Sequence, residues 1–165
     1  MPVGTLVINT PYTSSSPLDL GTMALNSSGT EFTAHAQFNN IVVTDTRSGI
    51  NGVNSYTVSA IASSLSDGKS NPGSTINAQN VGLTGVTVVP GAGFAGTTAT
   101  TDNPAADPAL APTASGTVGL GGTAKTVFTA TDSTGTVTAG GTLTINAPTS
   151  TEAGLFTGTI TFTVG

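Results

Sequence analysis

The sequence predicts an all-β protein, a β-sandwich of about nine to eleven mostly antiparallel strands with no substantial helix. Two features of the composition support this class. Thr is β-branched, favours strands and fills 33 of the 165 positions. The 22 Gly and 9 Pro are spread among short runs in which apolar and polar residues alternate, as in strands that are joined by turns.

The third observation is the end of the chain, from Leu155 to Val164, which carries the clearest strand pattern. Apolar and hydroxyl residues alternate there, as in a half-buried strand with one face on the core and one face in solvent. The apolar face comprises Phe156, Ile160, Phe162 and Val164. Four Thr residues form the opposite, solvent-facing side.

Earlier strands follow from the same pattern and from the turn residues between them. Two of these runs, 41–47 and 56–61, flank a loop rich in Gly and Asn, which predicts a β-hairpin. Residues 75–80 and 82–89 are predicted to form a second strand pair. The remaining predicted strands are 3–10, 31–38, 117–120, 124–131 and 141–145.

Residues 91–116 differ in composition, because Gly, Ala, Thr and Pro dominate them. Prolines at positions 104, 108 and 112 exclude a helix, so we expect an exposed irregular loop or an extended segment. With 165 residues and no other compositional boundary, residues 1–165 are expected to form one domain with a sizeable core.

Charge is scarce, since only 7% of residues are charged and the net charge is −5. The fixed cations are Arg47, Lys69 and Lys125, too few to follow a phosphate backbone, so nucleic-acid binding is not expected. The chain has no Cys and no apolar run long enough to span a membrane. Low charge, abundant Thr, Ser and Gly, and the lack of Cys are typical of an exported bacterial surface module.

Catalytic groups are sparse. A Ser-His-Asp triad would require His35, which lies in the middle of a predicted strand on the face opposite Phe32 and Phe38, where a solvent-facing role fits best. A pair of carboxylates could hydrolyse a glycosidic bond, but most of the eight acidic residues lie in turn-like contexts and the chain has no Trp to stack on sugar rings. We therefore expect a protein without enzymatic activity.

Bound groups are not expected either. Asp102, Asn103 and Asp107 lie on one Pro-rich segment and could contribute oxygen ligands to calcium, but their spacing matches no EF-hand and a solvated loop is the simpler interpretation. Lys69 and Lys125 could in principle form an internal isopeptide bond with Asn, yet both lie in polar, turn-like settings. The sequence thus predicts no cofactor and no metal.

Asp45 and Arg47 stand two residues apart on a predicted strand, so their side chains point to the same side. An ion pair that fixes the strand end and anchors the following loop is the favoured interpretation. The alternative is a charged spot that recognises a partner.

Several motifs resemble, in order, the WxL-type domains of Gram-positive cell-surface proteins. They are Gly4–Ile8, Leu18–Gly21, Val43–Arg47, Tyr56–Ala60 and Ala153–Val164. The chain departs from the family in having no Trp, and Phe162, Thr163 and Val164 stand where the final strand would carry its signature. Members of the family are non-catalytic modules that attach non-covalently to the cell wall, and we carry over no binding residue from them.

The sequence and this resemblance together predict a non-enzymatic, secreted module at the bacterial cell surface or cell wall. Its expected partner is peptidoglycan or another cell-wall polymer, or other surface proteins. The alternative is a self-assembling structural subunit of a surface layer or fibre, a homo-oligomer in which uncharged strand edges pair with neighbouring copies.

Overall fold

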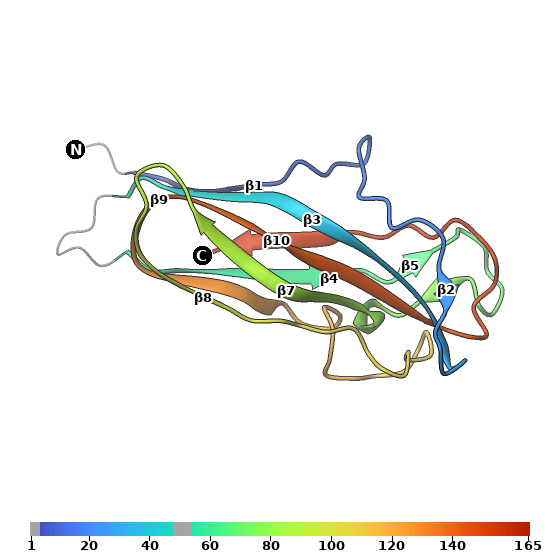
Figure 1. Cartoon of the computed structure of the whole chain (residues 1–165). Helices are drawn as coiled ribbons and strands as arrows, with labels where there is room; N and C mark the ends of the chain where they lie inside the picture. Colours follow the sequence, from blue (N-terminus) through green and yellow to red (C-terminus); the bar gives the residue numbers. More distant parts are fainter. Residues whose placement is uncertain (1–3, 48–53) are drawn as a thin grey trace.

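The computed structural model describes residues 4–47 and 54–165, and antiparallel strands dominate it (Figure 1). Among these residues the one helical element is the 3-10 turn Ala78–Asn80, so the predicted all-β class is confirmed. No helix in this part of the chain is long and apolar enough to cross a membrane. The strands are β1 (Leu6–Asn9), β2 (Ala24–Leu25), β3 (Glu31–Asp45), β4 (Tyr56–Ala62), β5 (Leu65–Ser66), β6 (Thr75–Ile76), β7 (Val81–Pro90), β8 (Ala95–Thr100), β9 (Lys125–Pro148) and β10 (Ile160–Val164).

The long strand β9 joins the two layers of the fold. Residues 125–134 pair with β4 and β8, whereas residues 135–148 pair with β3 and β7. The strand bends sharply between these halves (Figure 1), where Asp132 and Gly135 have φ angles of 52° and 87°. Such left-handed backbone is open to Gly and tolerated by Asp, which explains these residue types at the bend.

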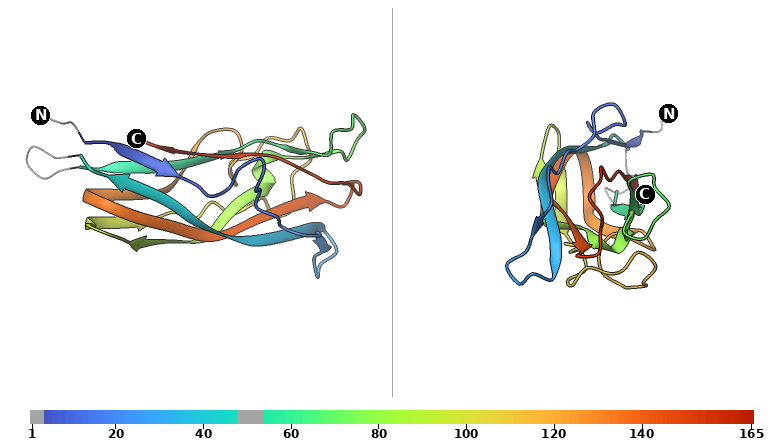
Figure 2. Two further views of the ribbon diagram at one scale, coloured as in Figure 1. Left: turned by 90° about the horizontal axis from the view of Figure 1, so that it is seen from above. Right: turned by 90° about the vertical axis from the view of Figure 1, so that its right-hand side faces the viewer.

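One layer therefore has the order β1-β3-β9-β7 and the other has the order β10-β4-β9-β8. Together they form a sheet that is nearly closed into a barrel-like shape, which is visible end-on in Figure 2. The core lies between the layers. Its largest fully buried side chains include Phe128, Ile41, Leu83, Val58 and Val137.

Two predicted strand pairings are wrong. Residues 41–47 and 56–61 do not form a hairpin, because β3 and β4 pair with different halves of β9 and lie in different layers. Residues 75–80 and 82–89 do not pair with each other either, since β6 pairs with β5 and β7 pairs with β9. A turn signal shows that the chain reverses, but it does not distinguish pairing in one sheet from stacking of two layers.

Strand boundaries also differ from those expected. The runs 31–38 and 41–47 belong to one strand, β3, whose pairing with β9 is interrupted by a bulge between Phe38 and Ile41. The segment 91–116 contains the strand β8, and its Pro-rich part carries the buried Ala106. The closing strand begins at Ile160, five residues later than predicted, and retains the expected alternation of half-buried apolar residues with exposed Thr.

Candidate functional site

An apolar cleft of about 1390 Å³ lies between the two layers. Its walls are formed by side chains of β3, β9 and β7 on one side and of β4 and β10 on the other. Across the cleft, the rings of Phe38 on β3 and Phe162 on β10 lie 6.4 Å apart between centroids. The volume of the cleft exceeds the range of about 300–1,000 Å³ of small-molecule sites, but its mostly apolar lining is typical of binding sites.

The cleft is open because the edge of β3 is only partly paired. β1 pairs with residues 42–45 of β3, and β2 pairs with residues 32–33. No described strand pairs with this edge between Ala34 and Ile41. On the other side of the opening, β10 is the last strand of its layer and pairs only with β4 among the described strands.

Alternation along β3 identifies the backbone groups at this free edge. The carbonyl of Glu31 accepts from Asn26 N, and the N–H of Asn39 donates to the Tyr12 hydroxyl at 2.9 Å, so both residues direct their peptide groups away from β9. Because every second residue of a strand faces the same neighbour, His35 and Gln37 direct their N–H and C=O groups to the free edge as well. These groups form a short, unpaired template for another strand.

Residues 10–23 cross the mouth of the cleft without forming strand pairs with β3. Leu18, Leu20 and Met23 from this segment are half-buried and pack against the core. Pro11 and Pro17 lack the N–H that a continuing strand would donate, which explains why the chain leaves the sheet after β1. The segment therefore covers the cleft with side chains rather than with backbone hydrogen bonds.

The lining of the cleft is almost free of charge. Among the described residues that line it, Asp19 and Glu152 are the only charged ones, and none is Lys, Arg or His. Asp19 accepts a hydrogen bond from Gly21 N at 2.8 Å, so its carboxylate also stabilises a local turn. An apolar surface with two acidic groups at its margin favours a neutral occupant over an acidic one.

A polar cluster lies at the end of β3. It contains Asp45 and Arg47, the two residues that the sequence predicts to form an ion pair. Arg47 Nη2 lies 2.8 Å from Asp45 Oδ2, and Asp45 Oδ1 accepts from both Arg47 N and Arg47 Nε at 2.9 Å. The hydrogen bonds from Arg47 hold the pKa of the buried Asp45 carboxyl below its ordinary value. The carbonyl of Arg47 accepts from Asn54 Nδ2 at 2.6 Å, which ties together both ends of the connection between β3 and β4.

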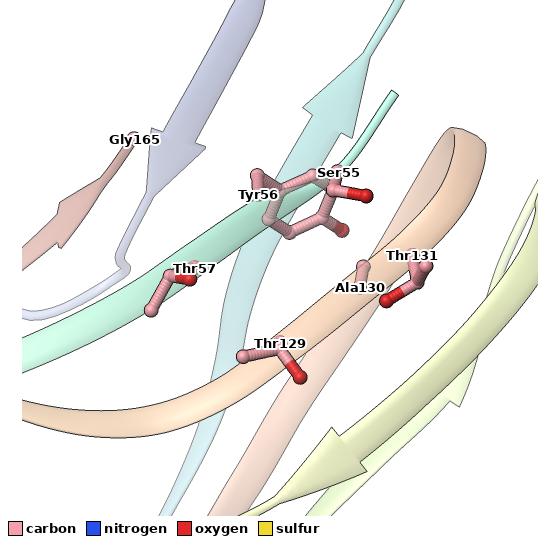
Figure 3. A pocket seen from close by; sticks show the side chains of 7 residues that line it. All are labelled: Ser55, Tyr56, Thr57, Thr129, Ala130, Thr131 and Gly165. Carbon is pink, nitrogen blue, oxygen red and sulfur yellow. The ribbon is translucent and has the colours of Figure 1, made fainter. Parts of the chain in front are cut away.

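Beside this cluster is a shallow depression of about 340 Å³ next to the C-terminal Gly165 (Figure 3). Its polar lining consists of neutral hydroxyl groups, from Ser55, Thr57, Thr129 and Thr131 in addition to Tyr56. Tyr56 is 4% exposed and packs edge-on against Phe128, and burial together with the charge of Asp45 raises its pKa to about 12. The described side chains of the depression can hydrogen-bond a neutral polar ligand, and none of them is charged.

The structure engages several of the acidic residues in structural hydrogen bonds. Asp102 accepts from Gly85 N and Val86 N at 3.1 and 3.0 Å, so it closes the bulge in β7. Glu31 accepts from Ala109 N at 2.9 Å and thereby holds the Pro-rich segment, and burial together with the nearby charge of Asp107 raises its pKa. His35 is exposed on β3, on the solvent side that the alternation predicted.

The residues that the sequence suggested as calcium ligands or as partners in an isopeptide bond make hydrogen bonds or ion pairs within the protein. Asn103 Nδ2 donates to the Thr126 carbonyl at 2.8 Å, and the carboxylate of Asp102 is directed to β7. In the described part of the chain, no three His, Cys, Asp or Glu residues come together as a metal site. Lys69 forms an ion pair with Asp67 at 2.8 Å, and Lys125 Nζ donates to the Thr117 carbonyl at 3.2 Å.

The cleft does not follow from the sequence pattern. The available signal was the interruption of the strand pattern between residues 10 and 23, where Pro and a run of Ser stand between apolar residues. That signal predicts a break in a strand, but which neighbouring edge is left unpaired depends on the strand order. Comparison with known proteins adds no relative, because no family model, curated protein or solved structure matches this chain.

Proposed function

We propose that this protein is a non-enzymatic structural subunit of a bacterial surface layer or fibre, which assembles by adding strands at its sheet edges. The observation that carries the proposal is the unpaired edge of β3 beside the open apolar cleft. Unpaired backbone groups next to buried apolar surface attract a further strand, which gains ladder hydrogen bonds and hydrophobic burial together.

The side chains of this edge favour assembly, although the bulge after Phe38 and the covering segment 10–23 protect part of it. Natural edge strands are usually blocked by Lys, Pro or inward-pointing charges. Between Ala34 and Ile41, β3 carries none of these, and its interruption is limited to the bulge after Phe38. The outer strand β10 carries no charged residue either.

Self-association should therefore increase with protein concentration. In sedimentation velocity, the weight-average sedimentation coefficient is expected to rise steadily as the protein is concentrated. It should stay elevated at about 1 M NaCl, because backbone pairing and apolar burial are not screened by salt. A single monomeric species at all concentrations would exclude the assembly proposal, and dissociation by salt would indicate contacts between charges instead.

A second candidate function is non-covalent association with a cell-wall polymer, as the resemblance to WxL-type domains implies. The observation that favours it is the hydroxyl-lined, uncharged depression beside Gly165. Neutral hydroxyls suit the many hydroxyl and amide groups of a wall glycan or peptide. Both functions place the protein outside the cell, and they can coexist because the depression and the cleft share no lining residue.

Co-sedimentation with purified Gram-positive peptidoglycan tests this second candidate. We expect the wild-type protein in the pellet from acid to neutral pH. The double variant Thr57→Val and Thr129→Val keeps the side-chain shape but removes two hydroxyls, and it should leave a larger fraction in the supernatant. The matched control is Thr138→Val, which removes one Thr hydroxyl elsewhere on β9. Wild-type protein that remains in the supernatant throughout the pH range would rule out wall binding.

A further inference from the structure

We propose that β3, between Ala34 and Ile41, accepts an extended, uncharged β-strand from a neighbouring surface subunit, which lies over the cleft with alternate apolar side chains pointing into it. The inference deepens the assembly function proposed above. It rests on that function only in assigning the strand to another surface subunit, because the acceptor site is defined by this chain alone.

The free edge determines that the occupant has a peptide backbone. His35 and Gln37 present N–H and C=O groups that no described strand pairs, and an incoming strand would supply the complementary groups. A lipid or another purely apolar molecule could fill the cleft, but it would cover these polar groups without satisfying them. Covering unsatisfied backbone groups is costly, so the edge favours a strand.

A single contact already illustrates this pairing. The Tyr12 hydroxyl accepts from Asn39 N at 2.9 Å, and thus takes the place that a strand carbonyl would occupy at the edge. It is the one side-chain hydrogen bond that the covering segment 10–23 makes to β3 among the described contacts. Displacement of this segment by a strand would therefore exchange one hydrogen bond for several.

The cleft determines the side chains of the strand. Side chains of a strand alternate between its two faces, so one face of the incoming strand would meet the apolar lining and the other would meet solvent. Apolar residues at every second position meet that requirement. The two carboxylates of the lining, Asp19 and Glu152, disfavour acidic residues in the strand.

The length of the site sets its strength. No described strand pairs with this edge over residues 34–41, and the bulge after Phe38 limits its regular part to residues 34–38, or about 17 Å of extended chain. One strand of that length buries less surface than a standard stable interface, so an isolated strand is expected to bind weakly and reversibly. Repetition of the same contact along a layer or fibre would provide the remaining stability through multivalency.

A labelled peptide with the sequence of residues 156–164 is a suitable probe, because it is uncharged and alternates apolar residues with Thr. We expect fluorescence anisotropy to show saturable binding of this peptide to the full chain. Two further peptides carry N-methyl groups on alternate amides. One is methylated at all its odd-numbered positions and the other at all its even-numbered positions. At least one of them should bind about tenfold more weakly or worse, because N-methylation removes donors and blocks the pairing edge.

The matched protein variants are Gln37→Pro and Thr98→Pro. Gln37 directs its N–H to the free edge of β3, so proline there removes one edge donor and leaves the pairing of β3 with β9 in place. Thr98 directs its N–H to the outer edge of β8, because Thr101 N donates to Val127 on β9 and the direction alternates along the strand. Gln37→Pro should weaken peptide binding about tenfold, and Thr98→Pro should bind as the wild type does.

The outcomes separate the acceptor site from the assembly function. Absence of saturable binding, or equal binding of all three peptides, would overturn the acceptor site, even if the protein self-associates. Binding of the parent peptide alone by a protein that stays monomeric would support the acceptor site and reject self-assembly. If Gln37→Pro does not fold, the N-methylated peptides on the wild-type protein decide the question.

Discussion

Gly135→Ala is expected to lower the free energy of unfolding by about 3–5 kcal/mol, because it combines backbone strain with a steric clash. Gly135 has a φ angle of 87°, which residues with a Cβ rarely adopt. An added Cβ would lie 2.2 Å from the carbonyl carbon of Gly93, in the connection between β7 and β8. Urea denaturation followed by circular dichroism measures the loss.

Gly29→Ala is the control for this substitution. Gly29 has a similar φ angle of 70°, but an added Cβ there meets no atom within 4 Å. The control should therefore show the conformational penalty alone, about 1–2 kcal/mol. Equal losses in the two variants would mean that close packing of the β9 bend against the β7–β8 connection does not stabilise the fold.

This bend illustrates what the sequence could predict and what it could not. The alternation of apolar and polar residues is local, and it identified the closing strand and most of β3 and β4. The pairing of β3 and β4 is not local, because each joins a half of β9 that is 65 or more residues away along the chain at every paired position. The predicted hairpin and strand pair were therefore wrong, although β3, β4 and β7 lie where strands were predicted. Of the predicted strand 75–80 only Thr75–Ile76 is extended, and the predicted strand 117–120 is not formed.

The cleft was unpredictable for the same reason. It exists because β1 and β2 pair with separate parts of β3 and leave one edge of residues 34–41, the edge opposite β9, without a strand between them. Each of those strands is visible locally, at best, as a short extended run. The gap is a property of the strand order, which no pattern along the chain encodes.

The pair of Asp45 and Arg47, in contrast, was predictable. Two residues that are two positions apart on a strand share a face, and a charge-poor chain offered each of them few other partners. The sequence did not predict that Asp45 would be 1% exposed, or that it would also accept from Arg47 N. The burial of Asp45 depends on the layer that packs over β3, whereas the bond from Arg47 N is a local turn contact between residues two positions apart.

Asp45→Asn is expected to destabilise the protein by about 2–4 kcal/mol at neutral pH, because three donors of Arg47 lose their anionic acceptor. The guanidinium is 32% exposed and can be hydrated, which keeps the loss below that of a completely buried pair. Asp19→Asn is the matched control, since Asp19 is exposed and Asn retains the oxygen that accepts from Gly21 N. The control should change stability by no more than about 0.5 kcal/mol.

The same variant gives a pH dependence of defined sign. The hydrogen bonds from Arg47 lower the pKa of Asp45 below its ordinary value of 3.8, so the unfolded state binds a proton more readily than the folded state. The contribution of Asp45 is therefore complete above pH 3.8 and is lost as the pH falls through the lower, folded-state value. The difference in unfolding free energy between wild type and Asp45→Asn should shrink as the pH falls through this range. A difference that stays constant down to pH 2 would mean that Asp45 acts through its shape and packing, and not through its charge.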